Sequence, residues 1–185
     1  MDTDLLFQTL SACSSPLRAD KELMVSLLHE EEHPAGKLLQ RKGTPADKLW
    51  FINSGFVMGY YPAEPLYQVC LFSSKGEFVT SASGFFSQGL SAKNLVCKQE
   101  TRLLYIKYTD LQELRKLPSM AMAYESMMAQ YQARGIRRMR SLLYDRPAER
   151  LQKLLERYPA ILGIAKPAEI SSYLGISRRT FYRLL

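Results

Sequence analysis

The last twenty residues of the chain, 166–185, constrain the fold more than any other segment. They hold two short helical patterns on either side of a Gly-Ile-Ser turn. Pro167 suits the opening of the first helix, because its missing N–H would have no intrahelical partner there. Gly175 can adopt the left-handed conformation that ends a helix, and Ser177 is a good N-cap for the next one. The tail is therefore predicted to contain three helices, at 146–158, 167–174 and 177–185.

The last of these helices carries three arginines, and its apolar residues Phe181, Leu184 and Leu185 can pack against a core. Two helices joined in this way are typical of a helix-turn-helix, whose second helix enters the major groove of DNA. An arginine early in that helix can pair with guanine, a contact worth about 1–3 kcal/mol of discrimination, whereas cations near the first helix are better placed for phosphate. We predict that the residues contacting duplex DNA are Ser177, Arg178, Arg179, Thr180, Tyr182 and Arg183, with Lys166 and Ser171 at phosphates.

Positive charge is concentrated in the C-terminal part of the chain. Residues 132–185 contain 12 Lys and Arg against 4 Asp and Glu, whereas residues 1–131 contain 13 against 14. A nearly neutral N-terminal part and a basic C-terminal part indicate a sensor domain followed by a segment that binds a polyanion. The alternative is an arginine-rich helix surface that is merely solvated, because charge alone predicts attraction and no fold.

The composition argues against several other classes of protein. The sequence has no run of about 18 apolar residues that could form a transmembrane helix, and its acidic start lacks the basic region of a secretory signal. Cys13, Cys70 and Cys97 are too scattered for a disulfide framework or a zinc site. His29 and His33 lie in an acidic stretch and are expected at the solvated surface, so no catalytic or metal-binding cluster is legible. We expect a cytoplasmic protein that is not an enzyme.

The front part of the chain changes from a helical to a β-type pattern. Leucines recur at helical spacing over 3–14 and 19–30, whereas 34–107 contains short β-rich runs between glycines. Several short strands with turn signals about 8–12 residues apart indicate an antiparallel sandwich or barrel, and a jelly roll is the favoured form. Strands are expected at 49–52, 56–61, 67–72, 95–97 and 103–106.

A long helix is predicted to follow Pro118 and to extend to about residue 144. Its apolar residues recur in steps near three and four, which makes a heptad-like seam over 120–142. We expect one side to pack on the sheets and the other on the same helix of a second copy, with Gly135 as a bend and Asp145 as the cap of the next helix. The seam consists of Met120, Tyr124, Met127, Tyr131, Met139 and Leu142.

Six short motifs follow one another in an order that is typical of one family. They are Pro34–Leu39, Lys42-Gly43, Asp47–Val57, Lys75–Phe78, Arg146–Leu151 and Tyr173–Arg178. With these motifs, the chain resembles the Crp–Fnr superfamily of bacterial transcription regulators over nearly its whole length. The resemblance implies an α+β fold with a cyclic-nucleotide-binding-type β-roll at 1–117, a dimerisation helix at 118–144 and a helix-turn-helix domain at 145–185.

The resemblance also indicates where an effector would bind. In members that bind cyclic nucleotide, a Gly-Glu pair opens the ligand segment and an arginine on the phosphate closes it. Gly76-Glu77 match the opening, but Ser91 stands where the arginine would be, and nearby Lys93 offers only a point charge. Burying a phosphodiester without a fork of donors is costly, so we expect no usual cyclic AMP binding. The candidate residues for some other ligand, between 77–94 and the long helix, are Glu77, Ser91, Lys93, Tyr124, Met127 and Met128.

Other cofactors of the family are not expected. Members with an iron–sulfur cluster have an N-terminal group of cysteines, while this chain has Cys13 alone there, and the two histidines make poor haem ligands. Because the chain stops at Leu185, about two and a half turns into the recognition helix, we expect fewer phosphate contacts and a frayed end. The sequence identifies neither the effector nor the operator.

The implied partners are duplex DNA, a second copy of the chain, RNA polymerase and an unidentified small-molecule effector, with no membrane. The alternative interpretation is a ligand-binding module whose helical tail contacts another protein. Phosphate contacts impose a steep dependence of affinity on salt, so the salt dependence of DNA binding distinguishes the two.

Overall fold

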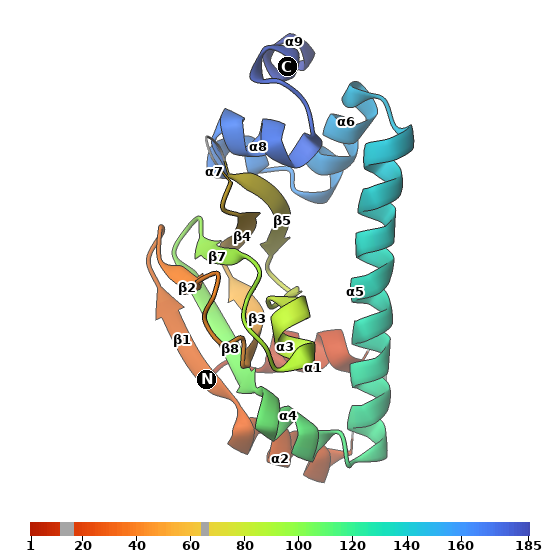
Figure 1. The fold of residues 1–185 in the computed structure, drawn as a ribbon. Coiled ribbons are helices and arrows are strands. Elements are labelled where there is room, and N and C mark those ends of the chain that lie inside the picture. Colours follow the sequence, from red (N-terminus) through yellow and green to blue (C-terminus); the bar gives the residue numbers. More distant parts are fainter. Residues whose placement is uncertain (12–16, 64–66) are drawn as a thin grey trace.

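Eight strands form two antiparallel sheets in the front part of the chain (Figure 1). The computed structural model describes residues 1–11, 17–63 and 67–185. The strands are β1 His29–His33, β2 Leu38–Gln40, β3 Lys48–Ser54, β4 Phe56–Tyr61, β5 Gln68–Ser74, β6 Phe78–Val79, β7 Asn94–Cys97 and β8 Thr101–Lys107. One sheet has the order β1-β8-β3-β6 and the other β2-β7-β4-β5. The predicted antiparallel β-roll is therefore confirmed.

Each of the five predicted strands is present, but β1, β2 and β6 were not predicted. Residues 29 and 30 were expected at the end of a helix, and this was wrong, because they belong to β1, which pairs with β8 from His29 to His33. The carboxylate of Glu31 in β1 accepts hydrogen bonds from Lys48 Nζ at 2.7 Å and from Trp50 Nε1 at 3.3 Å. A strand made of histidines and glutamates has no apolar alternation, so hydrophobic periodicity could not reveal it.

Two apolar clusters hold the roll together. One fills the space between the sheets around Trp50, Ile52 and Leu103. The other lies under the first sheet, where Phe51 and Leu104 meet the short helices. These helices are α1 Asp4–Ser11, α2 Arg18–Leu27, α3 Ala82–Ser87 and α4 Tyr108–Leu114. The helices predicted at 3–14 and 19–30 are thus present but shorter, and residues 12–14 of the first lie outside the described part of the chain.

The long helix α5, Pro118–Tyr144, runs along the whole roll (Figure 1). It remains helical through Gly135, so the expected bend does not interrupt it. Met120 is 5% exposed and packs on the roll together with Tyr124 and Met127. The predicted seam is therefore divided, because its first half lies against the chain's own roll.

Four helices make up the tail: α6 Pro147–Arg157, α7 Ile161–Ile164, α8 Pro167–Leu174 and α9 Arg178–Leu184. The short helix α7 was not predicted. Asp145 was expected to cap α6, but the Arg146 N–H donates to the Glu149 carboxylate at 2.8 Å instead. Asp145 forms an ion pair with Lys153 at 2.6 Å and follows the last residue of α5.

The tail and the roll share one hydrophobic core, and the tail helices lie over the ends of β4 and β5 (Figure 1). Apolar side chains of both parts belong to this cluster, so the second sheet buries its outer face against the tail. Because this core joins residues of the roll to residues of the tail, packing does not separate the two parts. The domain boundaries at 117 and 144 therefore stay predictions. Its buried members are Phe56, Met58, Val69 and Phe72 from the roll, and Leu151, Leu154, Tyr158, Ile161, Ala165, Ile170, Leu174 and Phe181 from the tail.

A substitution in the tail should therefore destabilise the roll as well. Leu154 is 4% exposed, and Leu154→Ala should lower the free energy of unfolding by about 2–5 kcal/mol through lost burial and a cavity. The fluorescence of Trp50, the single tryptophan, reports the roll. Its midpoint in urea should fall together with the loss of helical circular dichroism. Leu162→Ala is the control, because Leu162 is exposed; a Trp50 midpoint unchanged by Leu154→Ala would show that the two parts unfold independently.

Candidate functional site

The helix pair at the C-terminus is fixed by local hydrogen bonds. The Lys166 N–H donates to the Glu169 carboxylate at 2.7 Å, which caps the start of α8. Gly175 has φ of 65°, a left-handed conformation that ends α8 and that glycine adopts freely. Ser177 Oγ accepts from the Thr180 N–H at 3.0 Å and caps α9. The turn predicted from the sequence is thus present in full.

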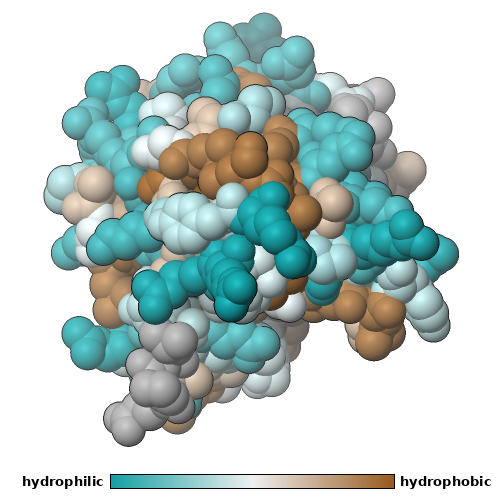
Figure 2. All heavy atoms as spheres, turned by 90° about the horizontal axis from the view of Figure 1, so that it is seen from above, coloured by the Kyte–Doolittle hydropathy of each residue, from teal (hydrophilic) through white to brown (hydrophobic). Residues whose placement is uncertain are grey.

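The outer face of α9 is cationic and lies beyond α8, at the opposite end of the molecule from α2 and α4 (Figure 1). Phe181 is 1% exposed and anchors the inner face, whereas Arg178, Arg179 and Arg183 are exposed. Within the described residues, none of these three arginines forms an ion pair. Seen from this end, most of the surface is hydrophilic around a smaller hydrophobic area (Figure 2). The cations are therefore free for an anionic partner.

The other residues expected at DNA differ in their accessibility. Tyr182 is 62% exposed, and Lys166 is exposed. The hydroxyls of Ser177 and Thr180 lie 2.9 Å apart and bind each other. Ser171 is 2% exposed, and its hydroxyl donates to the Pro167 carbonyl at 2.7 Å. The expectation that Ser171 meets a phosphate is corrected, because its side chain faces the interior.

Helix α8 is held against strand β5 by polar contacts at buried positions. The Val69 N–H donates to Ser172 Oγ at 2.9 Å. Glu169 is 3% exposed and forms an ion pair with Lys98 of the roll at 2.7 Å. Tyr67 donates its hydroxyl to the same carboxylate at 3.3 Å, and burial together with Glu169 raises the pKa of Tyr67. These contacts fix the first helix of the pair to the roll.

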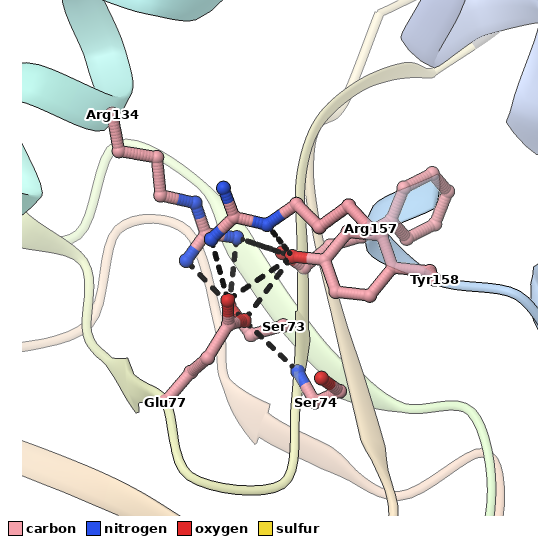
Figure 3. A network of polar contacts seen from close by, with 7 residues as sticks. Ser73, Ser74, Glu77, Arg134, Arg157 and Tyr158 are labelled. Atoms are coloured by element: carbon pink, nitrogen blue, oxygen red, sulfur yellow. Dashed lines mark hydrogen bonds and ion pairs between the residues drawn. The ribbon is translucent and has the colours of Figure 1, made fainter. Parts of the chain in front are cut away.

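A second junction surrounds Glu77 and joins the roll to both α5 and α6 (Figure 3). The Glu77 carboxylate lies 2.6 Å from Arg157 Nη2 and 3.3 Å from Arg134 Nη1, and it accepts from the Ser74 N–H at 3.0 Å. Tyr158 donates its hydroxyl to the Phe72 carbonyl at 2.7 Å. One carboxylate thus organises cations from two helices.

The surroundings of Tyr158 and Arg157 in this junction raise the pKa of both groups. Burial raises the pKa of Tyr158 well above its usual range, and although Arg134 opposes this, Tyr158 stays a neutral donor. Burial opposes the charged form of Arg157, but the hydrogen bonds and charges around it, led by Glu77, outweigh burial and raise the pKa of Arg157. Arg157 therefore stays charged at every physiological pH.

The residues expected to bind a ligand do not come together in one cavity. Glu77 and Met127 line one cavity of about 450 Å³, but Lys93 lines a second cavity and Met128 a third. Ser91 is 2% exposed, and its hydroxyl donates to the Lys93 carbonyl at 2.6 Å. Tyr124 and Met127 pack against the core of the roll.

The place expected for the ligand is open beside Glu77, where a cavity of about 450 Å³ is lined by Glu77, Met127 and Arg134, but it is filled beside Met128. The space near Met127 and Met128 is about 10 Å³ and is closed by Phe78, Phe86 and Tyr131, whereas a water molecule needs roughly 10–15 Å³. Phe85 is completely buried and packs against Phe86 and Tyr108. The aromatic pair therefore contributes to the core.

No metal site or membrane span is found in the part of the chain that the structure describes. No three His, Cys, Asp or Glu side chains cluster there. His33 lies 3.1 Å from Glu31, and His29 stacks on Tyr105. Each described helix is too short or too polar to cross a bilayer. Cys70 and Cys97 are free thiols, and Cys13 lies outside the described residues.

No protein-family model matches the chain, and no curated protein matches it in sequence. Solved structures do match it. The c-di-GMP-responsive global regulator CLP of Xanthomonas campestris is 20% identical with a TM-score of 0.69, covering 90% of this chain and 89% of that one. FixK2 of Bradyrhizobium japonicum is 18% identical with a TM-score of 0.72, covering 85% and 82%.

A structure from Eubacterium rectale assigned to the Crp/Fnr family of transcriptional regulators is 16% identical with a TM-score of 0.69, and the match covers 91% of this chain and 82% of that one. Each of these three matches covers at least 82% of both chains. At this level of identity, the likeness concerns the fold. The resemblance found in the sequence is confirmed to that extent: the chain has the fold of the Crp–Fnr regulators.

Proposed function

We propose that the chain is a DNA-binding transcription regulator of the Crp–Fnr type, acting in the cytoplasm. The observation that carries the proposal is the outer face of α9, where Arg178, Arg179 and Arg183 are exposed without ion pairs on a helix pinned by Phe181. Arginine suits both guanine edges and phosphates. The fold supports this assignment, because a recognition helix in a helix-turn-helix presents its first residues to the major groove.

We further propose that the active form is a homodimer joined along α5. Met122, Ala129, Ile136 and Leu143 recur every seven residues on the exposed side of this helix. Met122 is 60%, Ile136 54% and Leu143 68% exposed, and Met139 between the last two is 56% exposed. A heptad repeat of apolar residues is the pattern of a two-helix seam. Such a dimer would present two α9 helices to successive major grooves, about 34 Å apart.

The proposed regulator does not bind cyclic AMP in the usual way. The Glu77 carboxylate is occupied by Arg134 and Arg157. Ser91 offers no cation where the family has an arginine, and its hydroxyl is engaged with the Lys93 carbonyl. Titration calorimetry with cyclic AMP tests this part of the proposal, and micromolar affinity would contradict it.

Two substitutions should separate base reading from phosphate binding. Arg178→Ala should lower the preference for a selected operator over an unrelated duplex by about 1–3 kcal/mol, because a guanine contact is lost. Lys166→Ala should weaken binding to both duplexes alike and reduce the slope of log affinity against log salt by about one. Competition assays with an operator selected from a random library measure both effects.

The control for these variants is Lys116→Ala, an exposed lysine at the opposite end of the molecule, paired with Glu113. It should leave DNA affinity and salt slope unchanged. Equal behaviour of Arg178→Ala and Lys166→Ala in the competition assay would refute the division of roles. A tail that contacts a protein partner instead would show no binding to duplex DNA at low salt.

A charge in the α5 stripe should dissociate the dimer. Ile136→Asp places a carboxylate in the proposed seam, where burial is costly, and should give a monomer at micromolar concentration in sedimentation equilibrium. Leu162→Asp is the matched control, since Leu162 is an exposed apolar residue of α7, 46% accessible, away from the stripe. A wild-type chain that is itself monomeric under these conditions would contradict the homodimer.

A further inference from the structure

A buried lysine near the start of β7 lies among side chains of its own charge. It lines a cavity of about 380 Å³ that is bounded by the roll, α5 and the tail. No carboxylate of the described residues belongs to this lining. The cations that do belong to it are Lys93, Arg134, Arg137, Arg138, Lys153 and Arg157.

Half of these cations have a counter-charge outside the lining. Arg134 and Arg157 form ion pairs with Glu77, and Lys153 forms one with Asp145. The other three form no ion pair within the part of the chain that the structure describes. Their positive charge is therefore uncompensated.

Lys93 is the most buried of these three cations, since Arg138 is half-buried and Arg137 exposed. Its backbone is fixed, because the Ser91 hydroxyl donates to the Lys93 carbonyl at 2.6 Å. The residue is 8% exposed, yet its ammonium has neither an ion pair nor a hydrogen-bond acceptor among the described residues. Burying an unpaired ammonium is costly. A change that replaces this charge by an anion is therefore favourable.

The surroundings of Cys70 show which cation is near the Lys93 ammonium. Burial raises the pKa of the Cys70 thiol, and the charges of Lys93 and Arg138 both oppose that rise, so both cations lie close to this thiol. Arg138 donates to the Tyr173 carbonyl at 2.8 Å and lies over the Tyr173 ring. These partners are uncharged, so the Arg138 guanidinium keeps its full charge beside Lys93.

We infer that Lys93 is a carboxylation site, where its amine reacts with carbon dioxide to give a carbamate that pairs with Arg138 and Arg137. The ammonium first loses a proton to water. The nitrogen lone pair then forms a bond to the carbon of carbon dioxide, one C–O π pair moves onto oxygen, and a second proton leaves the nitrogen for water. No oxidant or reductant takes part. The product carries one negative charge where the lysine carried one positive charge.

The cavity stabilises this product more than it stabilises the free lysine. The carbamate has two oxygens that accept charge-assisted hydrogen bonds from guanidinium groups. Carbon dioxide is small and uncharged, so it enters a buried place without the cost of desolvating an ion. An exposed lysine such as Lys42 has no such gain, because water already solvates its ammonium. Since Lys93 belongs to the roll and both arginines to α5, the carbamate joins the roll to the long helix.

Trapping with triethyloxonium, followed by mass spectrometry of peptides, tests the inference on the full chain. Triethyloxonium esterifies a carbamate, and isotopically labelled bicarbonate in equilibrium with carbon dioxide marks the adduct. At constant pH and ionic strength, the yield at Lys93 should exceed the yield at Lys42 by about tenfold, the ratio that corresponds to about 1.4 kcal/mol. Equal yields at the two lysines, or no adduct at Lys93, would overturn the inference. This measurement needs no variant, so it does not depend on the folding of one.

Thermal unfolding separates covalent capture from the binding of bicarbonate as an ion. Carbon dioxide with bicarbonate should raise the melting temperature of the wild type above its value in chloride at equal ionic strength, because only the folded chain holds the carbamate. Lys93→Arg keeps the positive charge, but a guanidinium forms no carbamate, so the rise should disappear. Lys42→Arg is the matched control and should keep the full rise. A rise that persists in Lys93→Arg would contradict the carboxylation of Lys93. No DNA is present, so the result is independent of the proposed function.

Discussion

Burial of the outer face of the second sheet against the tail is the constraint on which the arrangement of the molecule depends. Phe56, Val69 and Phe72 of the roll cover Leu154 and Tyr158 of the tail in one core. Neither side could leave this surface in water without losing about 25 cal/mol for each Å² of apolar area. The roll therefore does more than carry the tail; it supplies part of the tail's core and fixes the direction in which α9 points.

Polar contacts then make this arrangement specific. Apolar packing alone tolerates small shifts, whereas Glu169 with Lys98, and Glu77 with Arg134 and Arg157, each need one geometry. Glu169 and Lys98 are mostly buried, so removing one of them leaves the other unpaired at a cost of several kcal/mol. The Glu77 and Glu169 junctions thus join the tail to the roll at two separate places.

The sequence predicts well what is local and poorly what is long-range. The turn at Gly175, the cap at Ser177 and the bounds of α8 follow from residue types and spacing, and the structure has all three. Strand β1 has no hydrophobic periodicity from which it could be predicted. It is held instead by contacts of its glutamates with residues distant in sequence, such as Lys48. The inward turn of Ser171 and the gathering of cations around Lys93 likewise depend on how the tail docks, which no local pattern encodes.

The charge of the tail illustrates the same limit. Twelve basic residues in 132–185 suggest one large surface for a polyanion, yet Arg134 and Arg157 neutralise Glu77, Lys153 neutralises Asp145, and Arg138 binds backbone carbonyls at the tail. The arginines of α9 remain exposed and form no ion pairs with the residues that the structure describes. Net charge measures attraction at long range, but the partner of each cation depends on burial and distance. The basic residues of the tail are thus divided between contacts that dock it on the roll and the exposed face of α9.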